Sequence, residues 1–551
     1  QSGAFYPLNI LFTLFPFQTA WTLLIISQTT GMLLFTYLFL RRQQVDPTAS
    51  VFGSVVMAFM GFSISWLTWG TIVSSFLWVP LMLVAVGILE TEKHMMKRIV
   101  WELILLFSVL ASVTAGHAQL ALYSLGITAL YALWKSIGAR TLRPFRSVLF
   151  VYIVFGVLSF PWLIRYWSMI QNSLRVAGGS DYLVEGFFIP LQHLIQFLIP
   201  DFFGNPATLN YWGTWNYGEL VGYVGAAGLI CATLGVFSKH KDKWFWFGLL
   251  GLSLLFSVDS LVARLPYIMH LPIISSLQPT RLLSITGLSL AVLSAFGVEY
   301  VYSKDMNRHS VRYVVIAFTA IWLGIMAFGR FGMRSEMIEH VVVAQRNSYL
   351  PFAFAVATLG ILVISTIHLF KKFRWVAISC KALLVALLVI DLLRFGWKFT
   401  PFTKSEYFFP ETTIISYLKK NPQPQRVLTL SSDIMPANAL GYYGIEMVGG
   451  YNPIYSARYA RFVSAMESGI ASDTLKFQRI IEPMNINSPL FRFFAAGYVV
   501  SRAPLELGKY EEVAREGETK LYKIPNPVER FYVADAVKIF ANDSEVLGAM
   551  L

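Results

Sequence analysis

An ionisable side chain at a tight turn is the first candidate for chemistry in this sequence. His117 lies in the run Gly116–Gln119, which joins two apolar segments. An imidazole can gain or lose a proton near neutral pH, and an ionisable residue at the mouth of a pair of membrane helices is often functional. The alternative is a histidine that only satisfies its hydrogen bonds at the membrane interface.

Two arginines are candidates for binding a phosphate group. Arg281 ends the run Leu277–Arg281, which follows a long proline-containing segment, and Arg165 comes shortly after Pro161. A guanidinium group is always charged and its planar array of donors matches a phosphate, so an arginine at headgroup depth can hold a lipid phosphate. The alternative for Arg281 is a topological or headgroup anchor, which is common at the ends of membrane spans, and the alternative for Arg165 is simple interfacial solvation.

Aromatic and acidic side chains gather between residues 200 and 219. This segment contains Asp201, Tyr211, Trp212 and Glu219. Aromatic rings can stack on sugar faces while carboxylates accept hydrogen bonds from sugar hydroxyls, so we expect these four residues to contact a sugar or an acceptor. The aromatic residues also fit the belt found at bilayer interfaces, but that belt does not require the two acids.

Sequence motifs for several other chemistries are absent. There is no Walker A run, no GxGxxG between a strand and a helix, no His/Cys spacing typical of zinc and no GxSxG. The only two cysteines, Cys231 and Cys380, lie in apolar stretches, which supports neither a disulfide framework nor a cysteine metal site. We therefore expect no bound metal at such a site, no ATP-driven pump and no soluble-type hydrolase.

The composition indicates that a membrane positions these residues. Of 551 residues, 56% are hydrophobic and only 14% are charged, and the mean hydropathy is +0.58. A soluble chain of this length is far more polar, whereas a membrane helix needs roughly 17–25 mostly apolar residues. About twelve such windows follow one another, at 17–40, 51–68, 72–90, 98–114, 117–135, 147–165, 219–238, 244–259, 281–302, 313–330, 350–370 and 377–397.

Positive charge falls on alternate connections between these windows. The net charge is +13, and Lys and Arg cluster at 41–42, 93–98, 135–146, 239–243, 304–312 and 371–374. Such short clusters between apolar runs are typical of membrane topology and not of nucleic-acid binding, so we expect no nucleic-acid partner. The positive-inside rule places these six connections in the cytoplasm.

The same rule predicts the organisation of the chain. Residues 17–398 form a transmembrane domain, and the outer connections are 1–16, 166–218, 260–280 and 331–349. Window 51–68 is rich in Gly and Ser and is a candidate for a re-entrant segment. Asp391 is close to the outer end of its window, where we expect simple interfacial solvation.

A soluble domain is predicted over residues 399–551. Charged residues, Asn and Pro become frequent there and no window is apolar enough to span a bilayer. The runs Arg426–Leu430 and Gly497–Val500 favour strands, whereas 454–468 favours a helix, so we expect an extracytoplasmic α+β domain.

Several of these runs together resemble the bacterial YfhO family of membrane proteins. The resemblance extends in order over essentially the whole chain through Gln1–Asn9, Gly116–Gln119, Pro200–Gly204, Pro279–Arg281 and Gly449–Pro453. Three further runs resemble the end of the family's outer domain, namely Ala496–Val500, Leu521–Lys523 and Glu529–Phe531. Each motif alone is short, and the order of all of them carries the resemblance.

The resemblance implies a polytopic helical fold similar to GT-C glycosyltransferases, in the bacterial cytoplasmic membrane. It implies an enzyme that moves a sugar from a polyprenyl-phosphate donor to a cell-envelope acceptor such as lipoteichoic acid. The base of GT-C enzymes is usually an Asp in the first outer loop, and the sequence begins inside that loop, so we expect this Asp upstream of Gln1. A requirement for a divalent cation stays open.

In such a reaction, cations stabilise the departing phosphate. Arg281 is the main candidate for this role, with Arg165 and His117 as weaker ones.

Two alternatives need no catalytic base. One is a transporter or flippase for a lipid-linked sugar, which usually has ionisable groups near the bilayer midplane, and these spans have few central charges. The other is a non-catalytic scaffold that assembles envelope enzymes.

Overall fold

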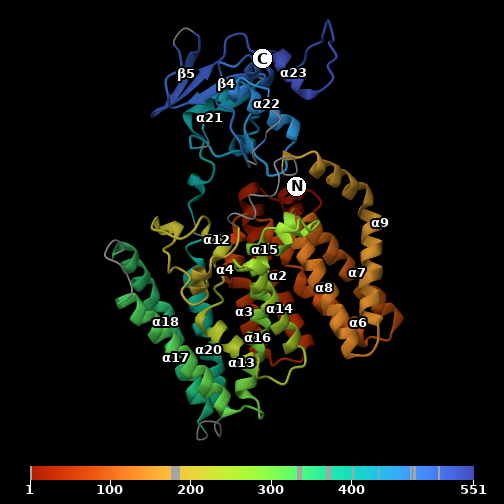
Figure 1. The fold of residues 1–551 in the computed structure, drawn as a ribbon, viewed down its shortest axis with the longest axis vertical. Helices are drawn as coiled ribbons and strands as arrows, with labels where there is room; N and C mark the ends of the chain where they lie inside the picture. Colours follow the sequence, from red (N-terminus) through yellow and green to blue (C-terminus); the bar gives the residue numbers. More distant parts are fainter. Residues whose placement is uncertain are drawn as a thin grey trace. The chain divides into compact units, whose positions relative to one another are not determined.

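The computed structural model describes residues 3–174, 187–331, 338–367, 374–399 and 403–551, the last range with short gaps at 423, 432, 472–474, 476–478 and 507–508 (Figure 1). The chain forms two compact units. The first consists of Gln1–Leu158 and Leu183–Phe402, and the second of Ser159–Tyr182 and Thr403–Leu551. Each unit is described by itself below.

The first unit is helical. Its α-helices are α1 (Leu11–Leu14), α2 (Phe17–Arg42), α3 (Pro47–Phe59), α4 (Gly61–Leu67), α5 (Ile72–Phe76), α6 (Val79–Thr91), α7 (Met95–Thr114), α8 (Ala118–Gly138), α12 (Tyr217–Leu220), α13 (Ala226–Gly235), α14 (Lys243–Ser257), α15 (Leu261–Ile268), α16 (Leu283–Tyr302), α17 (Arg308–Phe331), α18 (Ile338–Thr366) and α20 (Arg374–Gly396). Short 3-10 helices are η1 (Pro7–Ile10), η2 (Leu191–Phe197), η3 (Pro206–Thr208), η4 (Ile274–Ser276) and η5 (Pro279–Leu282). The long helix α9 (Arg143–Gln171) begins in this unit.

Eight helices among the described residues are long and apolar enough to cross a membrane, and nine if one bent pair counts as a single span. They match eight of the twelve predicted windows, namely 17–40, 72–90, 117–135, 147–165, 281–302, 313–330, 350–370 and 377–397. The bent pair is α3 and α4, which meet at 46° and cover the Gly/Ser-rich window 51–68. The mostly helical, polytopic architecture is therefore confirmed.

The other three predicted windows do not pass the same test. Helix α7 has 20 residues but includes Lys97, Arg98 and Glu102. Helices α13 and α14 have only 10 and 15 residues, and a helix of that length rises about 15–22 Å, less than the roughly 30 Å of bilayer hydrocarbon. Twelve full spans are thus more than the described helices provide.

Helix α16 lies at the centre of the first unit, where it packs against α3, α13 and α14. Eighteen of its twenty residues are buried, as expected for a helix that is apolar on all sides. Small residues permit the closest approach, because a Cβ on Gly297 would lie only 1.8 Å from the Cys231 carbonyl oxygen of α13. This close packing of α13 on α16 fixes the positions of the segments that precede the two helices, Tyr217–Gly225 and Pro279–Leu282.

Two apolar segments are interrupted at neighbouring points. The first is the bend between α3 and α4 at Met60, and the second is the non-helical stretch Val221–Gly225 between α12 and α13. The Gly61 N–H donates to the Tyr223 carbonyl oxygen at 2.6 Å. Non-helical backbone of this kind is tolerated at membrane depth only where protein or a polar cavity surrounds it, and all five residues of the stretch are buried.

The second unit contains a four-stranded sheet in the order β1–β4–β6–β5. Strand β1 (Arg426–Thr429) is parallel to β4 (Ala496–Ser501), whereas β6 (Thr519–Lys523) is antiparallel to β4 and to β5 (Glu511–Glu516). A separate antiparallel pair joins β2 (Gly450–Tyr451) and β3 (Ile480–Ile481). The α-helices are α21 (Thr413–Lys420), α22 (Ala457–Ser468) and α23 (Asp543–Met550), and the 3-10 helices are η7 (Ser405–Tyr407), η8 (Ala439–Tyr443) and η9 (Pro489–Phe494).

The central strands of this sheet are covered on both faces. Successive residues point to opposite sides, so Tyr498 of β4 joins a cluster with α21, whereas Val499 joins a cluster with α22 and α23. The predicted strands at 426–430 and 497–500 and the predicted helix at 454–468 are confirmed as β1, β4 and α22. The end of α9 belongs to this unit, because the Asn172 oxygen accepts from the Ala457 N–H at 2.9 Å.

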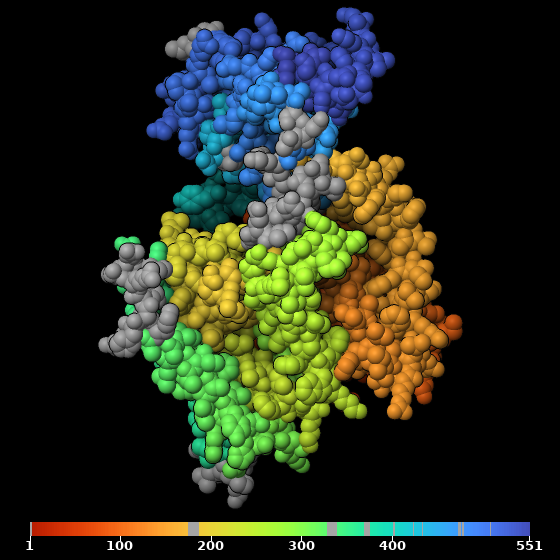
Figure 2. Space-filling model, viewed as in Figure 1, coloured from red at the N-terminus to blue at the C-terminus, as the bar shows by residue number. Residues whose placement is uncertain are grey.

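The predicted loops contain more structure than expected. Helix α9 continues to Gln171, and α15 occupies part of the predicted loop 260–280. Helix α18 begins at Ile338, inside the predicted loop 331–349, while residues 332–337 of that loop lie outside the described part of the chain. Figure 2 shows the surface of the first unit, where α14 and α15 appear in yellow-green.

Candidate functional site

Three predicted site residues from distant parts of the sequence meet in the first unit. His117 is the N-cap of α8, and its Nδ1 accepts a hydrogen bond from the Leu120 N–H at 3.2 Å. Glu219 lies in the single helical turn α12, and Arg281 lies in η5, directly before α16. These three side chains form the site that we call the arginine cluster.

The Arg281 guanidinium holds Glu219 with two hydrogen bonds. Its Nε donates to Glu219 Oε2 at 2.9 Å, and its Nη2 donates to Glu219 Oε1 at 2.5 Å. Both side chains are buried, and the guanidinium also lies 4.3 Å from the ring centre of Trp66. The ion pair and the stacking contact fix the orientation of the guanidinium group. Its remaining N–H donors therefore have a fixed direction as well.

Polar neighbours hold the same cluster in place through hydrogen bonds. Thr280 donates to Glu219 Oε2 at 2.9 Å, and Gln278 donates to the Thr280 hydroxyl at 2.9 Å. The Gln119 side chain makes two hydrogen bonds with the Gln278 backbone, at 2.7 and 3.2 Å. The runs Gly116–Gln119 and Leu277–Arg281, which were separate candidates in the sequence, are therefore parts of one hydrogen-bonded site.

The contact between His117 and Arg281 has an unusual hydrogen-bond arrangement. Arg281 Nη1 lies 3.1 Å from His117 Nε2, while Nδ1 of the same ring already faces the Leu120 N–H. A neutral imidazole has one N–H and one acceptor nitrogen, and an imidazolium has no acceptor. If Nδ1 accepts from Leu120, Nε2 carries the hydrogen, and two N–H donors then lie side by side. One oxygen of an anion could accept from both.

Asp201 forms a second polar cluster and does not join Glu219. Asp201 Oδ1 accepts from Asn205 at 2.8 Å and from the Tyr217 hydroxyl at 2.7 Å, and Oδ2 pairs with Lys398 Nζ at 2.5 Å. Its backbone oxygen accepts from Asn347 at 2.7 Å. The carboxylate is 3% exposed, so its polar neighbours already occupy the positions that a sugar would need.

We expect Asp201→Asn to lower the free energy of unfolding by about 1–3 kcal/mol, because hydrogen bonds to a charged group are lost and Lys398 loses its partner. Unfolding in mixed micelles, followed by tryptophan fluorescence, measures this change. The matched control is Asp259→Asn. Asp259 pairs with Arg264 at 2.7 Å on the surface, where such pairs contribute less than about 1 kcal/mol. Equal effects of the two substitutions would show that the Asp201 cluster is not a structural support.

Tyr211 and Trp212 belong to a packed aromatic group beside Asp201. Tyr211 donates to the Thr214 oxygen at 2.7 Å, and the Trp212 ring stacks on His340 with ring centres 4.8 Å apart. Burial lowers the pKa of nearby His193, although a hydrogen bond with Gln196 opposes this effect. The four predicted sugar-contacting residues therefore lie in two groups. Glu219 belongs to the arginine cluster, whereas Tyr211 and Trp212 lie beside Asp201.

Arg165 is a residue of the second unit. It is on the part of α9 that belongs to the second unit, and its side chain is exposed. The arginine cluster, by contrast, is built wholly from the first unit. The predicted contact of Arg165 with a lipid phosphate stays a prediction, beside the alternative of simple interfacial solvation.

The sequence interpretation missed a buried acid in α20. Asp391 is 1% exposed, so the expected interfacial solvation is wrong. Its Oδ2 accepts from the Tyr223 hydroxyl at 2.5 Å and from the Ala226 N–H at 3.0 Å, at the start of α13. A carboxylate is favourable at a helix N-terminus. The only available signal was an acid within an apolar window, because its partners Tyr223 and Ala226 are more than 160 residues away.

The comparisons with known proteins provide no relative. No family model matches the chain, and no curated protein or solved structure matches it. Within the described residues, no group of three or more His, Cys, Asp or Glu side chains could hold a metal ion.

Proposed function

We propose that this chain is a membrane glycosyltransferase of the YfhO family, with a GT-C-like architecture, that transfers a sugar from a polyprenyl-phosphate donor to a cell-envelope acceptor. The observation that carries the proposal is the arginine cluster. Three candidate residues chosen separately from the sequence form one site, in which Arg281 and Glu219 are buried, and His117 and Arg281 place nitrogen atoms 3.1 Å apart.

The chemistry follows from these donors. When the sugar–phosphate bond breaks, negative charge develops on the departing lipid phosphate, and fixed donors aimed at that charge stabilise the transition state. Arg281 Nη1 supplies one such donor, and His117 Nε2 supplies a second in the tautomer whose Nδ1 accepts from Leu120, while Glu219 holds the guanidinium in place. Because Glu219 neutralises the arginine, the site attracts a phosphate only when the histidine N–H or a second cation contributes.

The other parts of the proposal concern location and partners. We place the protein in the bacterial cytoplasmic membrane, with the second unit outside the cell, where lipid-linked donors and envelope glycopolymers meet. The positive-inside pattern of Lys and Arg supports this orientation. The aromatic group around Tyr211 and Trp212 is the proposed sugar-facing surface, and the second unit is the proposed acceptor-binding domain.

The test replaces His117 with Ala in the full-length protein and expresses it in a bacterial host that lacks its own copy. We expect the sugar content of surface glycopolymers, measured by mass spectrometry, to fall by roughly 10- to 100-fold, since a transition-state donor is lost. The matched control is His94→Ala, because His94 is the exposed N-cap residue of α7. Full glycosylation by the His117 variant at equal protein level would refute the proposed site.

A transporter for a lipid-linked sugar is the second candidate, and the two interrupted segments favour it. The bend at Met60, the stretch Val221–Gly225 and the buried Asp391 together provide broken helices beside an acid, as many transporters do. Vesicles containing the protein and a fluorescent polyprenyl-phosphate sugar distinguish the two candidates. Movement of the lipid across the bilayer without sugar transfer would favour transport.

A further inference from the structure

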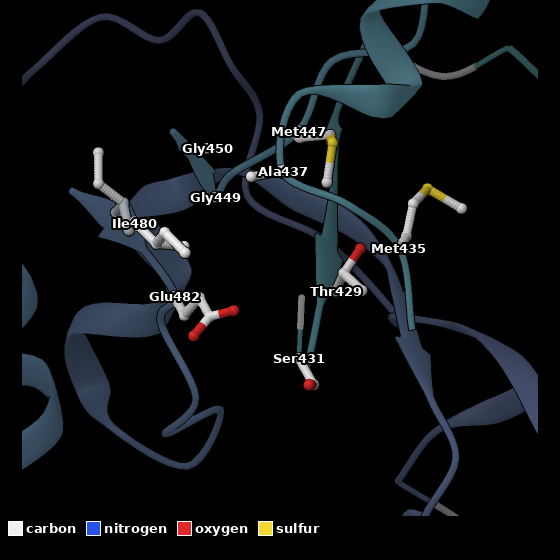
Figure 3. Close-up of a pocket in the computed structure, with 10 residues that line it drawn as sticks. Thr429, Ser431, Met435, Ala437, Met447, Gly449, Gly450, Ile480 and Glu482 are labelled. Carbon is white, nitrogen blue, oxygen red and sulfur yellow. The ribbon is translucent and has the colours of Figure 1, made fainter. Parts of the chain in front are cut away.

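A hollow lies beside the end of strand β1 in the second unit (Figure 3). Figure 3 shows Glu482 across this hollow from Thr429 and Ser431. The hollow has room for about one water molecule and not for a sugar or a phosphate ester. A ligand contact is better supported at the arginine cluster of the first unit, where one more donor remains uncommitted.

The Gln119 side chain has a fixed orientation beside the arginine cluster. Its Oε1 accepts from the Gln278 N–H at 3.2 Å, and its Nε2 donates to the Gln278 carbonyl oxygen at 2.7 Å. An amide with its two ends exchanged would place oxygen against oxygen and N–H against N–H at these contacts. The backbone of Gln278 therefore determines which end of the amide is the donor.

The second hydrogen of this amide is donated to Tyr123. Tyr123 follows Gln119 by four residues on α8, so the two side chains are neighbours on the helix surface. Gln119 Nε2 lies 2.8 Å from the Tyr123 hydroxyl oxygen, which must accept. The hydrogen of the hydroxyl itself consequently points elsewhere, and it has no acceptor within the described part of the chain.

Two other tyrosines of the first unit use their hydroxyl hydrogens. Tyr267 donates to the Leu277 carbonyl oxygen at 2.6 Å, and Tyr152 of α9 donates to the Leu125 carbonyl oxygen at 2.7 Å. Tyr267 is buried, whereas Tyr123 is partly exposed. Tyr123 thus differs from both in having a donor that the fold itself does not use.

This donor belongs to the arginine cluster by its position. Tyr123 is on the helix that His117 caps, and it lies close enough to Arg281 and Glu219 to interact electrostatically with both. Helix α8 therefore offers the His117 ring and the Tyr123 hydroxyl beside the guanidinium of η5. A phosphate group has several acceptor oxygens that face in different directions, so donors from two elements can bind it together.

We propose that Tyr123 is a further phosphate-binding residue of the arginine cluster and donates its hydroxyl hydrogen to an oxygen of the phosphate ester that Arg281 holds. The hydrogen on His117 Nε2 depends on the tautomer of the ring, whereas the Tyr123 hydroxyl is a donor in either case. The inference rests on the proposed function in taking a phosphate ester as the ligand. The contact itself requires no sugar transfer.

The experiment measures binding to the full-length protein in detergent micelles by isothermal titration calorimetry, with citronellyl phosphate, citronellol and inorganic phosphate as probes. We expect Tyr123→Phe to weaken the binding of citronellyl phosphate by about tenfold, because a hydrogen bond to a charged group is lost. The affinity for citronellol should stay unchanged. The matched control is Tyr152→Phe, which removes a hydroxyl that donates to Leu125 and should change neither affinity.

An unchanged affinity of the Tyr123 variant for citronellyl phosphate overturns the inference, as does a lack of binding of this ester to the unchanged protein. Equal losses for the ester and the alcohol overturn it as well, because they would show that Tyr123 only supports the fold. Inorganic phosphate that binds and loses affinity in the same variant supports the contact and shows that the phosphate group alone is recognised. Ester binding that depends on Tyr123 in a protein without sugar transfer supports the inference and refutes only the proposed function.

Discussion

Arg281→Ala is expected to lower the free energy of unfolding by about 3–5 kcal/mol, because it leaves Glu219 as an unpaired charge in a buried site. The two side chains share hydrogen bonds of 2.9 and 2.5 Å, and both are almost completely covered by protein. Equilibrium unfolding in mixed micelles, followed by tryptophan fluorescence, measures the loss. Sugar transfer should disappear in the same variant, but instability alone could cause that.

A double substitution separates the two effects. Arg281→Met with Glu219→Leu removes both charges and keeps apolar volume, and buried pairs replaced in this way often keep or gain stability. We expect this variant to be as stable as the unchanged protein to within roughly 1 kcal/mol and still inactive in glycosylation. A stable and fully active double variant would show that the ion pair has no role in phosphate binding. A single variant as stable as the double one would contradict the burial argument.

Gly297→Ala is expected to have a comparable effect on stability, with a loss of at least about 3 kcal/mol, the upper range for overpacked cores. The new Cβ would lie 1.8 Å from the Cys231 oxygen and 2.9 Å from the Gly235 nitrogen. These are backbone atoms, so no side-chain rotation can relieve the clash, and α13 has to move away from α16. The yield of folded, monodisperse protein and its unfolding midpoint measure the result.

The same substitution at another apolar helix provides the control. Gly324 in α17 and Gly360 in α18 have no atom within 4 Å of a Cβ built on them. Alanine favours a helix over glycine by up to about 1 kcal/mol, so both controls should be neutral or slightly stabilising. If Gly297→Ala behaves like them, α13 and α16 are not packed as closely as described.

Hydropathy predicted the long helices well because each contains enough apolar residues by itself. It failed at 219–238, where α12 and α13 are separated by the stretch Val221–Gly225. A continuous apolar run is equally compatible with a helix and with a buried extended segment, and composition does not distinguish them. The Gly225 φ of +81° ends the extended stretch before α13, and one glycine in an apolar sequence gave no warning of this.

The candidate site could be predicted residue by residue but not as an arrangement. His117 and Arg281 stand out because charged residues at the ends of spans are conspicuous. Their contact joins positions 164 residues apart, and no spacing rule reaches that far. Because they are close in the sequence, Asp201 and Glu219 were expected to contact the same sugar. In the fold, Asp201 instead pairs with Lys398, which follows 197 residues later. The residue types identified the candidate side chains, but only the tertiary structure shows which of them contact one another.

The shortness of α14 has a consequence for the lipid around the protein. Its 15 residues rise about 22 Å, yet Trp244, Phe247, Leu252 and Leu255 are exposed on its surface. Lipid chains that cover these side chains have to shorten by several ångströms relative to a bilayer core of roughly 30 Å. Hydrophobic mismatch would thus thin the membrane beside α14 and η5, which pack together. For the lipid-linked donor proposed above, this thinning would bring the phosphate group closer to Arg281.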